Sequence, residues 1–371
     1  MSRVRNITVI IANVPTMRPH VLAMATMQSQ AVTLVFIERE DGITGVGEAT
    51  TIGGLAYGEE SPEGIKLAIE RYFAPLIIGQ DADRPAAIMK RLAGAIVGNR
   101  FAKCAVETAL LDALGQVRGC PVSELVGGRL RDRVPVAWTL ASGDTARDIA
   151  EGEEMLSRRR HDIFKLKIGK RAVHEDCAHV SAIAKAFTGR ASVRVDVNQN
   201  WTRAQATDGI ARLQEAGVVL IEQPIAGDDL VGMRQLCDRF DVAIMADEGL
   251  TGPHSAWQFA DGRAADVFSL KITQSGGLTA ARDVAAIAAV ARIGLYGGTM
   301  LEAGIGTAAS AQLFATLPEF EWGTELFGPL LLTEELLEEP LQYADFSLTV
   351  PDRPGLGVRI DFDKLRRLAR Q

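Results

Sequence analysis

The sequence has few cysteines, no excess of positive charge and no long apolar run, and each of these would indicate a particular class of protein. It holds four cysteines in 371 residues, widely spaced and without a Cys-x-x-Cys pair, so we expect reduced thiols rather than a disulfide framework. Its formal net charge is −7 at pH 7, which argues against a nucleic-acid partner because such proteins usually present a basic face. Its apolar runs fall short of the roughly 20 residues that cross a membrane. We therefore expect a cytoplasmic protein that binds neither membranes nor nucleic acids.

The sequence also lacks a Gly-x-Gly-x-x-Gly turn after a strand, which argues against an open dinucleotide-binding sheet. Instead, short apolar runs alternate with helix-length segments from about Arg133 onward. Such alternation over about 200 residues predicts a parallel barrel of the (β/α)8 type. The eight runs are Val134–Thr139, Ile163–Lys167, Val193–Val197, Val219–Glu222, Ala243–Ala246, Val267–Lys271, Gly294–Gly298 and Glu321–Glu325.

The N-terminal part has a different pattern, in which strands come first and helices follow. Strand-like runs at Ile7–Val14 and Val32–Arg39 precede helical patterns, of which Phe101–Arg118 is the longest. This order predicts an α+β unit. We therefore expect an α/β chain with a modified (β/α)8-type barrel and three parts: an N-terminal α+β capping domain (1–130), the barrel with the active site (131–330), and a C-terminal segment that returns to the cap (331–371).

Charged side chains stand at the ends of successive apolar runs. The steps along the chain from Lys167 to Lys271 are 29, 26, 25 and 24 residues, each about one βα unit. Because the carboxyl ends of barrel strands meet at one face, these side chains should form a ring there. A single acid at the end of a strand is usually a helix cap or a solvated loop residue. Neither role explains charged residues at the ends of several successive strands with regular spacing. The series is Lys165, Lys167, Asp196, Glu222, Asp247, Lys271 and Glu325.

The three central acids, Asp196, Glu222 and Asp247, would repel one another unless a cation neutralised them. They offer only carboxylate oxygens, which suits Mg²⁺ or Mn²⁺ rather than zinc. Lys165 and Lys167 should point to the same side of their strand, and a neighbouring positive charge should lower the pKa of one of them. Lysines beside such a cation suit proton transfer at a carbon next to a carboxylate.

Several stretches of the sequence resemble the enolase superfamily and, within it, the muconate-lactonising subgroup. The resemblance covers essentially the whole chain, and the ordered Lys-x-Lys, Asp, Glu, Asp and Lys series is its most specific part. The stretches are TIGGLAYG (Thr51–Gly58), FKLKIG (Phe164–Gly169), RVDVNQ (Arg194–Gln199), LIEQPI (Leu220–Ile225), MADE (Met245–Glu248), LYGGTMLE (Leu295–Glu302) and WGTELFGPLLL (Trp322–Leu332).

The resemblance implies a role for each charged residue. Lys167 is expected to be the acid and base at the α carbon, and Lys165 to tune it and help hold a substrate carboxylate. Lys271 is expected to act electrostatically on the opposite face, and Glu325 to donate a proton. The implied cofactor is Mn²⁺ or Mg²⁺ on the three acids. The implied reaction interconverts the small dicarboxylate cis,cis-muconate and muconolactone in catechol and β-ketoadipate catabolism, in a homo-octamer.

Two loops and a glycine pair complete the expected substrate site. The segment from Ile52 to Tyr57 is predicted to be a mobile loop that closes over the barrel, and a second loop at Thr16–Met27, with Met17, Met24 and Met27, is predicted to join it. Gly298, with Gly297 before it, is predicted to let backbone N–H groups approach a substrate carboxylate. The residues expected to bind substrate are Ile52, Tyr57, Asn198, Gly298 and Phe327.

Other activities stay open on the sequence. On the same scaffold they are a chloromuconate cycloisomerase, an o-succinylbenzoate synthase and a dipeptide epimerase. The epimerase ranks low because Gly323–Phe327 reads GTELF where an Asp-x-Asp element is expected. From another class, a Schiff-base aldolase or a phosphosugar isomerase would use a strand-end lysine, and its activity would resist removal of metal. A binding barrel without catalysis would not need the paired lysines.

Overall fold

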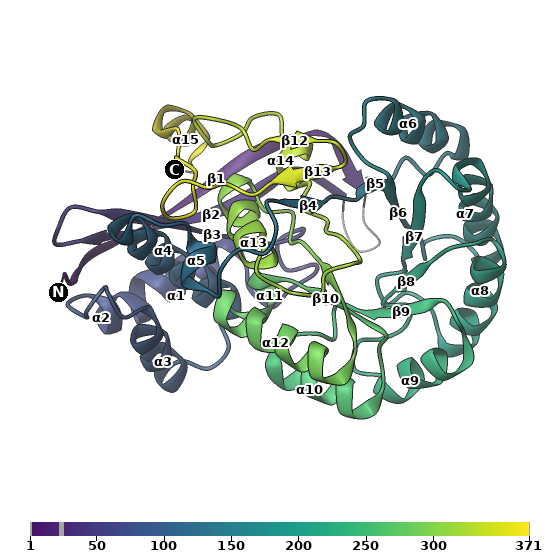
Figure 1. Cartoon of the computed structure of the whole chain (residues 1–371), viewed down its shortest axis with the longest axis horizontal. Helices are drawn as coiled ribbons and strands as arrows, with labels where there is room; N and C mark the ends of the chain where they lie inside the picture. The colour runs from purple at the N-terminus through teal and green to yellow at the C-terminus, as the bar shows by residue number, and fades with distance from the viewer. Residues whose placement is uncertain (1, 22–25, 371) are drawn as a thin grey trace.

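The structure is a computed structural model that describes residues 2–21 and 26–370. An N-terminal sheet with its helices lies on one side of the molecule, and a ring of helices surrounds the barrel strands on the other (Figure 1). The C-terminal segment lies near the N-terminal sheet (Figure 1). Its contacts include a hydrogen bond of 2.7 Å from the Arg370 backbone N–H to the Ile11 carbonyl oxygen.

The N-terminal sheet is formed within the described residues by three antiparallel strands, β1 (Val4–Val21), β2 (Thr26–Arg39) and β3 (Thr44–Thr50). The prediction of a loop over Thr16–Met27 is wrong for its described residues, because β1 and β2 continue through them. Their pairing shifts register between Pro15 and His20 and then resumes, so the prolines there mark an irregularity rather than the end of a strand. Met17 is exposed and Met27 is buried, while Met24 lies outside the described residues.

The N-terminal helices pack on this sheet, and α4 makes the closest approach. Gly45 and Gly47 of β3 face α4, where an added Cβ would lie 2.0 Å from the Ala109 carbonyl oxygen and 1.9 Å from that of Ala105. Two backbones can approach this closely only at glycine. The helices are α1 (Pro62–Ala68), a π-helical turn η1 (Ile69–Phe73), α2 (Ala74–Ile77), α3 (Pro85–Ala95), α4 (Arg100–Arg118) and α5 (Val122–Leu125).

The barrel is built, within the described residues, on a seven-stranded parallel sheet in which neighbours follow one another along the chain. Its eighth position is filled by an extended segment around Thr324, which bridges Gly297 on one edge and Val136 beside the other. The sequence predicted this position as a strand, but the pairing there is limited to single bridges. The strands are β5 (Trp138–Leu140), β6 (Ile163–Lys167), β7 (Ser192–Asp196), β8 (Leu220–Glu222), β9 (Ala243–Ala246), β10 (Val267–Leu270) and β11 (Gly294–Gly297).

The first predicted barrel run, Val134–Thr139, is divided between two sheets. Its beginning forms β4 (Arg133–Pro135), which pairs antiparallel with the C-terminal strand β13 (Ser347–Thr349). Only its end belongs to the barrel, as β5. An apolar run does not reveal which sheet its backbone will join, because that choice depends on strands far away in sequence. The short strand β12 (Tyr343–Ala344) and the helix α15 (Phe362–Leu368) complete the C-terminal segment.

The barrel helices cover the outside of the sheet and close the core. Apolar residues at helical spacing predict helices over Val173–Phe187 and Arg203–Glu215, and these are the bounds of α7 and α8. Thr202 begins α8 with a capping box, in which its side chain accepts from the Gln205 backbone N–H. The helices are α6 (Thr145–Ser157), α7 (Val173–Phe187), α8 (Arg203–Glu215), α9 (Leu230–Arg239), α10 (Pro253–Gly262), α11 (Ile272–Ser275), α12 (Leu278–Ala291), α13 (Gly304–Phe314) and α14 (Gly328–Leu331).

Two expectations from composition can be compared with the structure. In residues 2–21 and 26–370, every helix is too short or too polar to cross a membrane. All four cysteines lie in these ranges and are free thiols, with Cys104 and Cys177 buried. The prediction of four reduced thiols agrees with this arrangement.

Candidate active site

The charged residues meet at the carboxyl end of the barrel because neighbouring strands are in register. Lys167 of β6 pairs with Asp196 of β7, and Asp196 pairs with Glu222 of β8. Asp247 and Lys271 come directly after β9 and β10. Glu325 is held in place by a hydrogen bond of 2.7 Å from its backbone N–H to the Gly297 carbonyl oxygen. The structure therefore brings the predicted charged residues into one ring.

Lys165 is surrounded by carboxylates. Its side chain is 1% exposed, and its Nζ lies 2.8 Å from Glu325 Oε2, 3.3 Å from Asp196 Oδ2 and in contact with Glu222 Oε2. Burial alone would lower the pKa of Lys165, but the three carboxylates outweigh it and raise that pKa well above its usual range. Lys165 is therefore not the lysine whose pKa is lowered.

Lys167 has fewer acidic partners and reaches the open side of the ring. Its Nζ lies 2.5 Å from Asp196 Oδ2, and its side chain is 15% exposed. Both lysines therefore contact the same carboxylate, which confirms that they point to one side of β6. Burial would raise the pKa of Asp196, but Lys167 and Lys165 hold it well below its usual range.

The opposite wall of the ring joins the barrel to the N-terminal domain. Lys271 Nζ lies 2.6 Å from Asp247 Oδ1 and donates a hydrogen bond of 2.6 Å to the Tyr57 hydroxyl. That hydroxyl donates in turn to Asp247 Oδ2 at 2.7 Å. Because Tyr57 belongs to the segment Ile52–Tyr57, this segment lies against the mouth of the barrel, where the sequence predicted it.

A narrow pocket lies between the charged ring and this segment. It includes four of the predicted substrate-binding residues, Ile52, Tyr57, Asn198 and Phe327. It also includes three residues that the sequence reasoning missed. Thr139 ends a predicted run and could have been found by the same rule as the acids. Thr299 and Leu301 follow the glycine pair, and nothing in their spacing distinguishes them. The lining is Ile52, Tyr57, Thr139, Lys165, Lys167, Asn198, Glu222, Asp247, Lys271, Thr299, Leu301, Glu325 and Phe327.

Gly298 has a different role from the predicted one. Its backbone N–H donates to the Leu270 carbonyl oxygen at 3.0 Å, and that of Gly297 donates to Gly323 at 2.9 Å. Both amides are used within the barrel, so the prediction that they approach a substrate carboxylate is wrong. A Cβ at Gly298 would lie 2.7 Å from Lys271 Cγ. The glycine therefore leaves room for the Lys271 side chain.

The donor atoms of the ring fit a hard divalent cation. Glu222 Oε1 is buried without a hydrogen-bond partner among the described residues, and burial together with the charge of Asp196 raises the pKa of Glu222 well above its usual range. A cation would satisfy that oxygen and relieve the repulsion. In the described ranges no three Asp, Glu, His or Cys side chains are grouped as ligands of one ion. The Lys165 ammonium lies between Asp196 and Glu222 instead.

Comparison with known proteins agrees with this geometry. Residues 6–127 match the family model "Mandelate racemase / muconate lactonizing enzyme, N-terminal domain", and residues 147–364 match "Enolase C-terminal domain-like". Muconate cycloisomerase 1-2 of Acinetobacter lwoffii is 59% identical over 99% of this chain and 96% of its own. A chloromuconate cycloisomerase of Cupriavidus pinatubonensis is 43% identical over 98% of both. The crystal structure of muconate lactonizing enzyme from Pseudomonas fluorescens complexed with muconolactone superposes with a TM-score of 0.98, at 55% identity over 100% of both chains.

The capped barrel with its ring of lysines and carboxylates defines an enzyme of the enolase type, a class that uses a divalent metal ion. Within that class, the chain belongs to the mandelate racemase / muconate lactonizing enzyme family. The resemblance that the sequence motifs indicated is therefore confirmed.

Proposed function

We propose that the protein is a cycloisomerase that interconverts cis,cis-muconate and muconolactone in the breakdown of aromatic compounds. The unequal surroundings of its two β6 lysines carry this proposal. Both lysines line the pocket, but Lys165 is buried and held by three carboxylates, whereas Lys167 contacts one and is partly exposed. Lys167 is thus the better placed to move a proton at a bound substrate. The likeness to muconate cycloisomerases over nearly the whole chain supports the choice of substrate.

The reaction needs one new C–O bond and one proton. A carboxylate oxygen of cis,cis-muconate attacks an alkene carbon of the same molecule, and the electron pair of that double bond moves toward the other carboxylate. Lys167 delivers a proton to the α carbon and gives muconolactone; in the reverse direction it removes that proton. Because nucleophile and electrophile are tethered, the protein chiefly orients the substrate and stabilises charge.

The other ring residues support this step. Asp196, Glu222 and Asp247 would hold Mn²⁺ or Mg²⁺, which when bound supplies Lewis-acid stabilisation of the negative charge that develops on the substrate. Lys165, oriented by Glu325, places a fixed positive charge beside the same region. Lys271 does so from the opposite wall.

The pocket walls suit a small dicarboxylate with a hydrocarbon middle. Ile52 and Phe327 offer apolar surface for the carbon chain, and Tyr57 and Asn198 offer polar groups near its ends. A homo-octamer in the cytoplasm belongs to the same proposal, and this part rests on the family resemblance.

The test follows the ultraviolet absorbance of cis,cis-muconate with purified protein and Mn²⁺, with and without EDTA. We expect the conjugated diene signal to disappear with metal present and to persist when EDTA removes it. An unchanged signal with metal present would contradict the proposal, and o-succinylbenzoate precursors and dipeptides would then be tried. If the diene signal disappears even in the presence of EDTA, the metal assignment is wrong. A higher kcat/KM for 3-chloro-muconate would assign the protein to the chlorinated substrate.

A further inference from the structure

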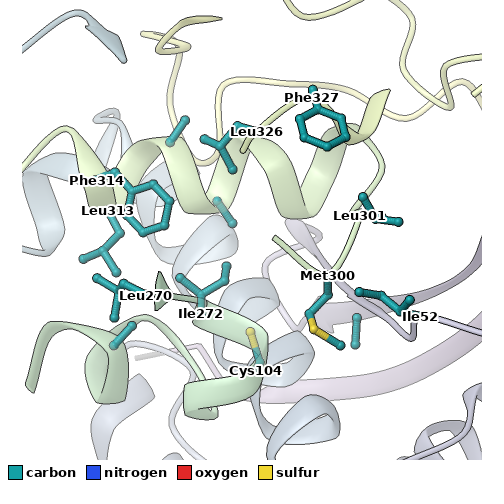
Figure 2. Packing of buried hydrophobic residues seen from close by; sticks show 14 of the residues in the cluster. Ile52, Cys104, Leu270, Ile272, Met300, Leu301, Leu313, Phe314, Leu326 and Phe327 are labelled. Atoms are coloured by element: carbon teal, nitrogen blue, oxygen red, sulfur yellow. The ribbon is translucent and has the colours of Figure 1, made fainter. Parts of the chain in front are cut away.

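Leu301 is held in a backbone conformation that leucine seldom adopts. Its φ angle is 59°, in the left-handed region where a side chain with Cβ is disfavoured. The side chain is buried and lines the pocket with Ile52 and Phe327. In the view of Figure 2, the Leu301 side chain lies between those of Ile52 and Phe327. Such a conformation persists only where its surroundings impose it.

The N-terminal sheet supplies the contacts to the carbonyl groups of this segment. Gln30 of β2 is 1% exposed, and its Nε2 donates to the carbonyl oxygens of Leu301 at 2.8 Å and Met300 at 3.1 Å. The Thr50 hydroxyl of β3 also donates to the Met300 carbonyl, at 2.9 Å. On the other side of the segment, the Leu301 backbone N–H donates to Thr299 Oγ1 at 2.8 Å.

These bonds link the backbone direction at Leu301 to the shape of the pocket. If Leu301 moved to a right-handed conformation, the peptide units beside it would rotate and its carbonyl would turn away from Gln30. The side chain would then leave the wall. Among the described residues, the Leu301 carbonyl receives its side-chain hydrogen bond from Gln30, whereas the Met300 carbonyl also has Thr50. Gln30 therefore has the greater effect on Leu301.

We propose that Gln30 is a positioning residue for substrate binding, which fixes the left-handed backbone of Leu301 so that its side chain forms one wall of the pocket. The inference rests on the proposed function. Leu301 would contact the hydrocarbon part of the substrate and none of the reacting charges. An interaction of this kind contributes equally to the bound substrate and to the transition state, so its loss raises KM and leaves kcat nearly unchanged.

The first test replaces the amide with an apolar side chain of similar length, Gln30→Met, and measures steady-state kinetics with cis,cis-muconate and Mn²⁺. We expect KM to rise about five- to tenfold while kcat stays within about twofold, the scale of one lost buried hydrogen bond and its consequence. The matched control is Gln312→Met. Gln312 is also buried, and its Nε2 donates to the carbonyls of Pro351 at 2.8 Å and Leu356 at 3.3 Å, away from the pocket lining.

The second test is a double-mutant cycle with Leu301→Gly. Glycine adopts the left-handed conformation without help but has no side chain to form the wall. Leu301→Gly should therefore raise KM by itself, and adding Gln30→Met should raise it little further. If the fold-changes in KM of the two single variants multiply in the double variant, Gln30 does not act through Leu301. If Gln30→Met does not fold, Gln30→Asn, whose amide is one methylene shorter, takes its place.

The outcomes separate this inference from the proposed function. Unchanged KM in the Gln30 variant, or an equal rise in Gln312→Met, overturns the positioning role while leaving the cycloisomerase in place. Wild-type protein that does not consume cis,cis-muconate overturns the proposed function itself, and the positioning role for this substrate with it.

Discussion

Lys165 and Lys167 differ in their surroundings although only one residue separates them. Lys165 is enclosed by Glu222, Glu325 and Asp196, which hold its charge in place and raise its pKa. Lys167 contacts Asp196 alone among these acids and is partly exposed. At the scale of single residues, this difference supports the proposal that Lys167 moves the proton and Lys165 supplies a fixed charge.

Replacing Lys167 by alanine should therefore stop the reaction while leaving the fold intact. We expect kcat for cis,cis-muconate to fall by about 10³-fold or more, since proton transfer by a positioned side chain contributes on that scale. The thermal unfolding midpoint should change little, because the side chain is partly exposed. The control is Lys170→Ala, which replaces an exposed lysine three residues beyond the end of β6. Turnover near the wild-type rate in Lys167→Ala would remove Lys167 from the mechanism.

At the scale of secondary structure elements, the contact of β3 with α4 has little tolerance for added volume. Gly45 and Gly47 bring the strand against the carbonyl groups of the helix. This contact positions β3, and β3 carries Thr50 and Glu48 to the barrel. The packing of β3 on α4 therefore affects the position of the barrel segment that forms the pocket wall.

Gly47→Ala should destabilise the protein, because the new Cβ would lie 1.9 Å from the Ala105 carbonyl oxygen and the helix would have to move. We expect a loss of about 1–3 kcal/mol in the free energy of unfolding, measured by urea denaturation. Gly94→Ala is the matched control. Gly94 lies within α3 with nothing within 4 Å of its added Cβ, so alanine there should be neutral or slightly stabilising. Equal stability of the two variants would refute the close approach.

At the scale of the whole molecule, buried side chains of the cap bind the barrel directly. Glu48 of β3 accepts hydrogen bonds from the backbone N–H groups of Ala303 at 2.6 Å and Gly306 at 2.7 Å, at the beginning of α13. Carboxylates are favoured at this end of a helix. Burial nevertheless raises the pKa of Glu48 to about 8, with a smaller contribution from the charge of Glu302.

This raised pKa predicts how stability changes with pH. The folded protein holds the Glu48 proton more tightly than the unfolded chain, whose value is near 4.5. The stabilisation is therefore complete below about pH 4.5 and is lost as the pH rises toward about 8. Glu48→Gln should flatten the fall of the unfolding free energy across this window, by at most about 1.4 kcal/mol per pH unit. Chemical denaturation at several pH values measures this slope. The control Glu215→Gln, at an exposed residue, should leave the pH slope of the unfolding free energy unchanged. A slope in Glu48→Gln equal to that of the wild type would contradict the prediction.

The parts of the fold and site that could be predicted are those with a local pattern. α7 and α8 follow from apolar spacing, and the positions of Asp196, Glu222 and Asp247 follow from the length of a βα unit. The strand predicted at the barrel closure does not form as a regular strand, because the segment around Thr324 bonds to its neighbours through single bridges. The hydrogen bond of the Gly298 amide to Leu270 could not be predicted, because a sequence does not show whether a backbone amide is already bonded.

The sequence by itself determined the barrel, its cap and the order of the charged ring, because each depends on a period that repeats along the chain. Only the tertiary structure decided which carboxylates Lys165 and Lys167 each contact. It also decided that Gln30 reaches Leu301 across 271 positions of sequence. The Gln30 contact joins a side chain of the N-terminal sheet to the backbone of the loop between β11 and α13. No local periodicity relates these two positions, so the contact exists only once the cap has packed on the barrel.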